Sequence, residues 1–191
     1  MTAISEFGYQ KSDVKRIIVT HSHLDHSGGL SEVKKATGAP VFMHALDAQL
    51  IRQGKSLRPS QPTPGFENFV EEMLANGPYP DPTATEVEFE LSGGEQVPGC
   101  PCLRAMHVPG HCAGQLAFML EHEGGVLIAA DAASHFETIC LPPIVEDLDT
   151  CKESLHRLAS LDFEIAVFGH GPPITESADQ LFRQNWGALV Q

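Results

Sequence analysis

The sequence predicts an α/β protein in which helices cover the outer faces of packed β-sheets. Strand-like apolar runs alternate with helix-like runs near both ends of the 191-residue chain, whereas strand-like runs follow one another in its middle. The chain is also 42% hydrophobic, which is enough to fill the core of one domain. We therefore expect a single domain that spans residues 1–191.

Composition and periodicity place the individual elements. β-branched and apolar runs predict strands at about residues 16–20, 40–43, 86–91, 102–107, 115–120, 125–130 and 164–168. Helical spacing of apolar residues predicts helices at about residues 27–36, 45–53, 67–75 and 147–160, and a last helix that Thr175 could cap. Residues 54–84 have ends rich in Pro, Gly and Ser, so we interpret them as an inserted, lid-like segment.

The charge balance limits the choice of partners. Twelve basic and 25 acidic residues give a formal net charge of −13. A surface this acidic repels phosphate backbones and anionic membranes. We therefore expect a small-molecule substrate and neither a nucleic-acid nor a membrane partner.

The cysteines indicate a reducing compartment. There are five of them, an odd number, and the first fifteen residues contain no apolar segment of the kind found in a signal peptide. Free thiols are typical of proteins kept in reducing surroundings. The expected location is therefore the cytoplasm.

One segment carries most of the chemical information. Residues 20–29 read THSHLDHSGG, so three histidines and one aspartate fall within six positions directly after an apolar strand. If the chain stays extended, its side chains alternate, and His21, His23 and Asp25 share one side while His26 points to another. Ligands divided in this way could hold two adjacent metal ions.

Three further ligand-type residues follow, each at the end of a predicted strand. His111 lies in a Pro-Gly-His turn, Asp131 ends a buried apolar strand, and His170 stands between two glycines after the last strand. Each of these residues is weak evidence by itself, because a histidine after Pro-Gly is usually only a turn residue. Ligands at strand ends that face one edge of a sheet are typical of sites in layered α/β proteins.

The four motifs in this order resemble those of the metallo-β-lactamase superfamily. The resemblance implies an αββα sandwich and a metal site similar to those of glyoxalase II and the acyl-homoserine lactonases. It implies one metal held by His21, His23 and His111, a second held by Asp25, His26 and His170, and Asp131 as a bridge between them. Imidazole and carboxylate ligands suit zinc, and also iron or manganese.

The expected activity is a metal-dependent hydrolysis of an ester, a thioester or a lactone. A hydroxide that bridges two divalent metals, most simply zinc, would attack the carbonyl carbon. Asp25 would act as a catalytic residue that orients this nucleophile and holds its proton. His135 follows Asp131 by four residues and is a candidate for contact with the substrate.

Three other functions remain open. An iron-dependent sulfur dioxygenase would use a similar fold with a single iron. A lactam hydrolase similar to the β-lactamases is disfavoured by Asp131, because the lactam-cleaving members with the most similar first motif lack a bridging aspartate. A non-catalytic, truncated member would act only in binding or assembly.

The expected sandwich departs from the family at its N-terminus. Family members usually have several strands before the first histidine motif, whereas the motif strand here starts at residue 16 and nothing before it has a strand pattern. The first sheet is therefore expected to lack its N-terminal strands and to expose an unpaired edge. We expect a homodimer or a higher homo-oligomer whose interface covers this edge.

Overall fold

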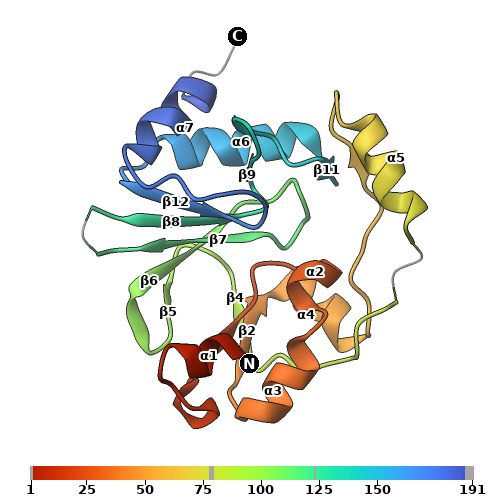
Figure 1. The fold of residues 1–191 in the computed structure, drawn as a ribbon, viewed down its shortest axis with the longest axis vertical. Helices are drawn as coiled ribbons and strands as arrows, with labels where there is room; N and C mark the ends of the chain where they lie inside the picture. Colours follow the sequence, from red (N-terminus) through yellow and green to blue (C-terminus); the bar gives the residue numbers. More distant parts are fainter. Residues whose placement is uncertain (1, 78–79, 123, 188–191) are drawn as a thin grey trace.

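The computed structural model describes residues 2–77, 80–122 and 124–187. Two β-sheets form its centre, and helices lie on the outer side of each sheet (Figure 1). The first sheet has three parallel strands in the order β1 (Ile17–Ile18), β2 (Val41–His44) and β4 (Phe89–Leu91).

The second sheet has five strands in the order β12-β8-β7-β6-β5. Its strands β5 to β8 are antiparallel to their neighbours, whereas β12 runs parallel to β8. The bounds of these strands are β5 (Gln96–Val97), β6 (Cys100–His107), β7 (Leu116–Leu120), β8 (Val126–Ala130) and β12 (Ile165–Phe168).

The helices and two small two-stranded sheets complete the described chain. The helices are α1 (Thr2–Glu6), α2 (Leu24–Ser27), α3 (Leu30–Thr37), α4 (Ala45–Arg52), α5 (Glu67–Ala75), α6 (Leu148–Ala159) and α7 (Ala178–Trp186), with a 3₁₀ turn, η1, at Lys11–Asp13. One two-stranded pair is a hairpin of β9 (Ser134–His135) with β10 (Ile139–Cys140), and the other is an antiparallel pairing of β3 (Gln61–Pro62) with the distant β11 (Ile144–Val145). No helix among the described residues is long and apolar enough to cross a membrane.

Alternating side chains of β2 face two different cores. Val41 and Met43 pack with residues of α3 and α4, whereas Phe42 between them belongs to the core between the two sheets. This alternation follows from the period of two along a strand.

The same alternation occurs in β7. Leu116 and Phe118 face the core between the sheets, whereas Ala117 and Met119 pack in the cluster that contains residues of α6 and α7. Each large apolar side chain buried in this way stabilises the fold by about 1.5–3 kcal/mol. Three cores between four layers confirm the predicted αββα sandwich.

The extended path predicted for the first histidine motif is wrong. β1 ends at Ile18, and α2 begins at Leu24, so Asp25 and His26 lie in a helical turn. The hydroxyl of Ser27 donates a hydrogen bond of 2.7 Å to the carbonyl of Ser22 and so closes the loop. The helix expected over 27–36 corresponds to α3, which begins only at Leu30, and the short helix α2 before it was not expected.

The start of the last helix also differs from the prediction. The chain pairs with β12 through an antiparallel bridge between Ala166 and Ile174. The amide of Ala178 then donates to the carbonyl of Glu164 at 3.0 Å. These contacts keep residues 174–177 beside the strand, so the helix begins at Ala178 and Thr175 does not cap it.

β1 lies at the edge of the three-stranded sheet, and no strand precedes it in the described part of the chain. Ile17 and Ile18 are only half-buried. A second copy that covers this edge stays a prediction. Light scattering at low micromolar concentration is expected to give a mass at least twice the 20.7 kDa of one chain. The interface between the copies is expected to bury more than roughly 2,000 Å² in total. A stable, folded monomer would contradict it.

Candidate metal centre

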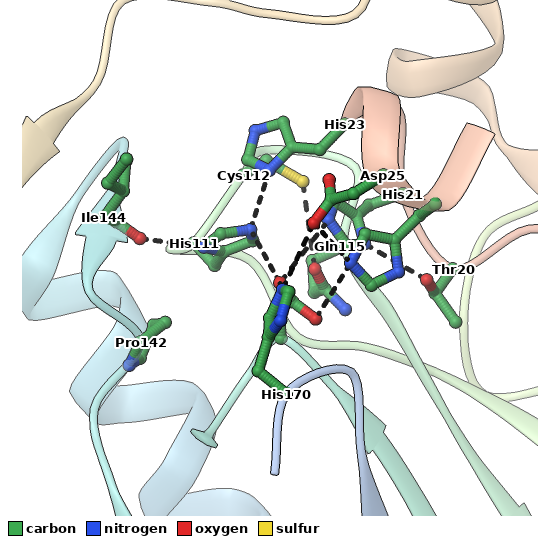
Figure 2. Close-up of polar contacts among 12 residues, drawn as sticks. Thr20, His21, His23, Asp25, His111, Cys112, Gln115, Pro142, Ile144 and His170 are labelled. Carbon is green, nitrogen blue, oxygen red and sulfur yellow. Dashed lines mark hydrogen bonds and ion pairs between the residues drawn. The ribbon is translucent and has the colours of Figure 1, made fainter. Parts of the chain in front are cut away.

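The seven residues expected as metal ligands lie in two neighbouring groups. Figure 2 shows five of them, His21, His23, Asp25, His111 and His170. The pairing of β8 with β12 explains part of this arrangement. The strands are parallel with Phe168 opposite Ala130, and the amide of Gly169 donates to the carbonyl of Ala130 at 3.0 Å. Asp131 is the first residue after β8 and His170 the second after β12, so the two are neighbours.

The ligand atoms fall into two groups, each with all its atoms within 4.8 Å of one another. The first group is His21, His23 and His111, and the second is Asp25, His26, Asp131 and His170. Asp25 thus joins His26, as the family resemblance implies, and not His21 and His23, as simple alternation predicts. The helical turn at α2 is the physical reason for this grouping.

Asp131 lies between the two groups. Its Oδ2 is 3.6 Å from Nε2 of His111 and 3.9 Å from Nε2 of His21, both in the first group. The same oxygen is 3.2 Å from Nε2 of His170, and Oδ1 is 3.3 Å from Nε2 of His26. A carboxylate in this position can reach an ion in either group.

Hydrogen bonds on the outer side of the rings orient two of the histidines. Nδ1 of His111 lies 2.7 Å from the carbonyl of Ile144, which leaves Nε2 directed toward the other ligands (Figure 2). Nδ1 of His21 lies 3.1 Å from the hydroxyl of Thr20. A metal-binding imidazole usually has such a partner, because the partner fixes the tautomer and the ring orientation.

Several buried polar atoms of the site lack a hydrogen-bond partner. They include Nε2 of His21, Nε2 of His26 and Oδ1 of Asp131. An unsatisfied buried polar atom is costly, and native proteins contain few of them. Cations would satisfy these atoms. The donor set of imidazoles and carboxylates suits zinc, iron or manganese, so the residues present fit two divalent ions.

The three histidines of the first group are held in the neutral form that binds a metal. Burial lowers the pKa of His21 and of His111 below the usual value and lowers the pKa of His23 to about 4. These imidazoles are therefore neutral near pH 7. The neutral form is the one that binds metals.

The second group holds protons when no metal is bound. Hydrogen bonds to Asp131 and Asp25 raise the pKa of His170 to about 10. Burial opposes the charged form of His26, but its contacts with the same carboxylates outweigh burial and raise its pKa to about 9. A metal that binds here must displace these protons, so binding to the second group is expected to strengthen as the pH rises from 7 toward 9.

His135 has contacts of a different kind. Its Nδ1 lies 2.8 Å from the carbonyl of Pro172, and its ring packs against Phe168 with the ring centres 5.6 Å apart. Its backbone amide also donates to the carbonyl of His170 at 3.1 Å. The backbone bond, which does not depend on the imidazole, holds the loop that carries His170. Contact between the His135 side chain and a substrate stays a prediction.

Three charged residues near the site were not predicted from the sequence. Asp47, Arg58 and Glu146 form ion pairs beside the two loops that carry the first group. Asp47 shares the buried face of α4 with Ala48 and Ile51. A carboxylate on the apolar face of an amphipathic helix is the signal that could have singled it out.

Comparisons with known proteins agree with the geometry. The chain is 26% identical to a protein of Bacillus subtilis named probable metallo-hydrolase YflN, over 85% of this chain and 66% of that protein. It is 24% identical to an Aspergillus fumigatus protein named atrochrysone carboxyl ACP thioesterase, over 91% of this chain and 43% of that one. The chain thus spans two thirds or less of these relatives.

Solved structures show the same fold. A metallo-beta-lactamase family protein from Thermus thermophilus aligns with a TM-score of 0.65 and 28% identity, over 96% of this chain and 63% of that one. A subclass B3 metallo-beta-lactamase of Bradyrhizobium japonicum aligns with a TM-score of 0.66 and 20% identity, over 97% and 74%. The family model of the metallo-beta-lactamase superfamily matches residues 2–170. The chain therefore belongs to the metallo-beta-lactamase superfamily, whose members are generally metal-dependent hydrolases.

Proposed function

We propose that this protein is a dinuclear metallohydrolase that cleaves an ester, a thioester or a lactone. The observation that carries the proposal is the pair of adjacent ligand groups with Asp131 between them. When bound, two divalent ions would lower the pKa of a water molecule toward neutrality and would polarise a substrate carbonyl.

The protein residues divide the remaining tasks. The side chain of Asp131 is 5% exposed and lies at the base of the site, whereas those of Asp25 and His170 are 57% and 42% exposed. A substrate would therefore approach from the side of Asp25 and His170. Close contacts with the imidazoles of His170 and His26 keep the pKa of Asp25 well below its usual value, so its carboxylate stays ionised and can accept a hydrogen bond that orients the nucleophile.

A thioester is the first substrate class to test. Three of the similar proteins are named thioesterases: the Aspergillus fumigatus protein, one from Aspergillus chevalieri that is 24% identical and one from Emericella nidulans that is 25% identical. The likeness to β-lactamase structures concerns the fold alone and does not favour a lactam substrate.

The proposal predicts two divalent ions, most simply zinc, per chain. Elemental analysis of protein purified without chelators checks this stoichiometry. One iron per chain would favour the sulfur dioxygenase instead. A content firmly at or below one ion after supplementation with zinc would contradict the dinuclear site.

The metal-loaded protein is also expected to hydrolyse a simple acyl thioester, an aryl ester or a lactone. Thiol release or acid release measures the turnover, and dialysis against a chelator is expected to abolish it. No turnover of any of the three substrate classes by protein that holds both metals would reject the proposal and would favour a non-catalytic member.

A further inference from the structure

A network of charged side chains lies beneath the first ligand group. The carboxylate of Asp47, on α4, is fully buried, and its Oδ1 accepts a hydrogen bond of 2.8 Å from Arg58. The same guanidinium lies 3.4 Å from Oε1 of Glu146, which follows β11. Arg58 also donates to the carbonyl of Leu46 at 2.5 Å. Three separate segments of the chain thus meet through one guanidinium group.

The network holds the first histidine loop by its backbone. Oδ2 of Asp47 accepts a hydrogen bond of 2.8 Å from the amide of Ser22. Ser22 lies between His21 and His23 and is itself buried, so its amide has few alternative partners. A hydrogen bond from an amide to an ionised carboxylate is stronger than one between neutral groups.

The network also holds the second histidine loop. Oε2 of Glu146 accepts a hydrogen bond of 2.9 Å from the amide of Ala113, and the amide of Glu146 donates to the carbonyl of His111 at 3.1 Å. The thiol of Cys112 lies 3.4 Å from Oδ2 of Asp47. Gly114 passes so close to Asp47 that a Cβ at this position would overlap its carboxylate.

We propose that Asp47 is a positioning residue that, with Arg58 and Glu146, sets the separation of the loops that carry His21, His23 and His111. This inference rests on the proposed metal-dependent function. The two loops are far apart in the sequence, and the Asp47 carboxylate contacts both of them. Asp25 and His170, by contrast, are held in ion pairs around Asp131. Loss of the Asp47 charge is therefore expected to affect the first group selectively.

The test uses Asp47→Asn, which keeps the size of the side chain and one oxygen acceptor. The amide has one oxygen, so it cannot accept hydrogen bonds from Ser22 and Arg58 as two separate carboxylate oxygens do. Zinc titration against a chelating dye gives two stepwise dissociation constants, and the step that is lost in His111→Ala identifies the first group. We expect Asp47→Asn to weaken that step about 10–100-fold, as removal of an outer partner of a metal ligand does, and to leave the other step unchanged.

A second readout separates positioning from general stability. The visible absorption spectrum of the cobalt(II)-loaded protein reports the ligand geometry, and Asp47→Asn is expected to change the band that His111→Ala removes. A second variant, Glu146→Gln, tests the inference if Asp47→Asn fails to fold. It keeps an oxygen acceptor for the amide of Ala113, so it is expected to weaken metal binding to the first group by a smaller factor than Asp47→Asn does. The matched control is Glu90→Gln, which removes an exposed partner of Arg52, also on α4, at 2.5 Å.

The possible outcomes are distinct. The inference is supported if the wild type binds two metals, Asp47→Asn weakens only the step of the first ligand group, and Glu90→Gln changes neither step. Equal weakening of both steps, or an unchanged first step, overturns the inference and leaves the proposed function standing. A wild-type chain that binds no metal overturns both.

Discussion

Asp131→Ala is expected to abolish hydrolysis and to lower the metal content of both ligand groups. Asp131 is the residue whose carboxylate oxygens face His21 and His111 on one side and His26 and His170 on the other. Its loss would remove a ligand from both ions and also the charge that balances the imidazoles of the second group. We expect activity to fall by more than about 100-fold, the upper end of the loss seen when an outer partner of a ligand is removed.

Elemental analysis and thioester turnover, measured on the same preparation, check this prediction. His135→Ala is the control, because the imidazole of His135 contacts the carbonyl of Pro172 and belongs to neither ligand group. It is expected to keep the metal content of the wild type. An Asp131→Ala protein with full activity and both metals would show that the end of β8 is wrongly assigned.

Gly169→Ala is expected to have an effect almost as large, although it adds only one methyl group. A Cβ at Gly169 would overlap Oδ1 of Asp131 and would lie 2.8 Å from Cε1 of His26. The backbone cannot easily move away, because the amide of Gly169 donates to Ala130 within the parallel pair of strands. Overpacking of this kind costs about 1–3 kcal/mol, and here the strain falls on two ligands of the second group.

We therefore expect Gly169→Ala to lose metal from the second group and most of its activity, with a modest fall in the free energy of unfolding. Metal titration and chemical denaturation measure the two effects. Gly29→Ala is the matched control, because this glycine lies in the first histidine motif with a φ of −88° and a Cβ there would meet no atom within 4 Å. Equal metal binding by the two variants would argue against the close packing of Gly169, Asp131 and His26.

Runs of β-branched and apolar residues allowed most of the large strands to be predicted. β6, β7, β8 and β12 lie within two residues of their predicted bounds, because each contains a run of four or more residues rich in apolar side chains. The helices α4, α5 and α6 were also located within one residue at each end. Short strands such as β3 and β9 were missed, since two residues carry no detectable period. β3 in addition forms a strand only through β11, which is distant in sequence.

The sequence by itself determined the identity of the candidate ligands, because metal-binding side chains in local motifs are recognisable before folding. Tertiary structure decided how they are grouped. The helical turn at α2 places Asp25 with His26, and the parallel pairing of β8 with β12 brings Asp131 beside His170. Tertiary structure also created the Asp47 network, since its ion pairs join residues 11 and 88 positions apart. Pairings across such distances depend on the packing of whole layers, which no local pattern of residues encodes.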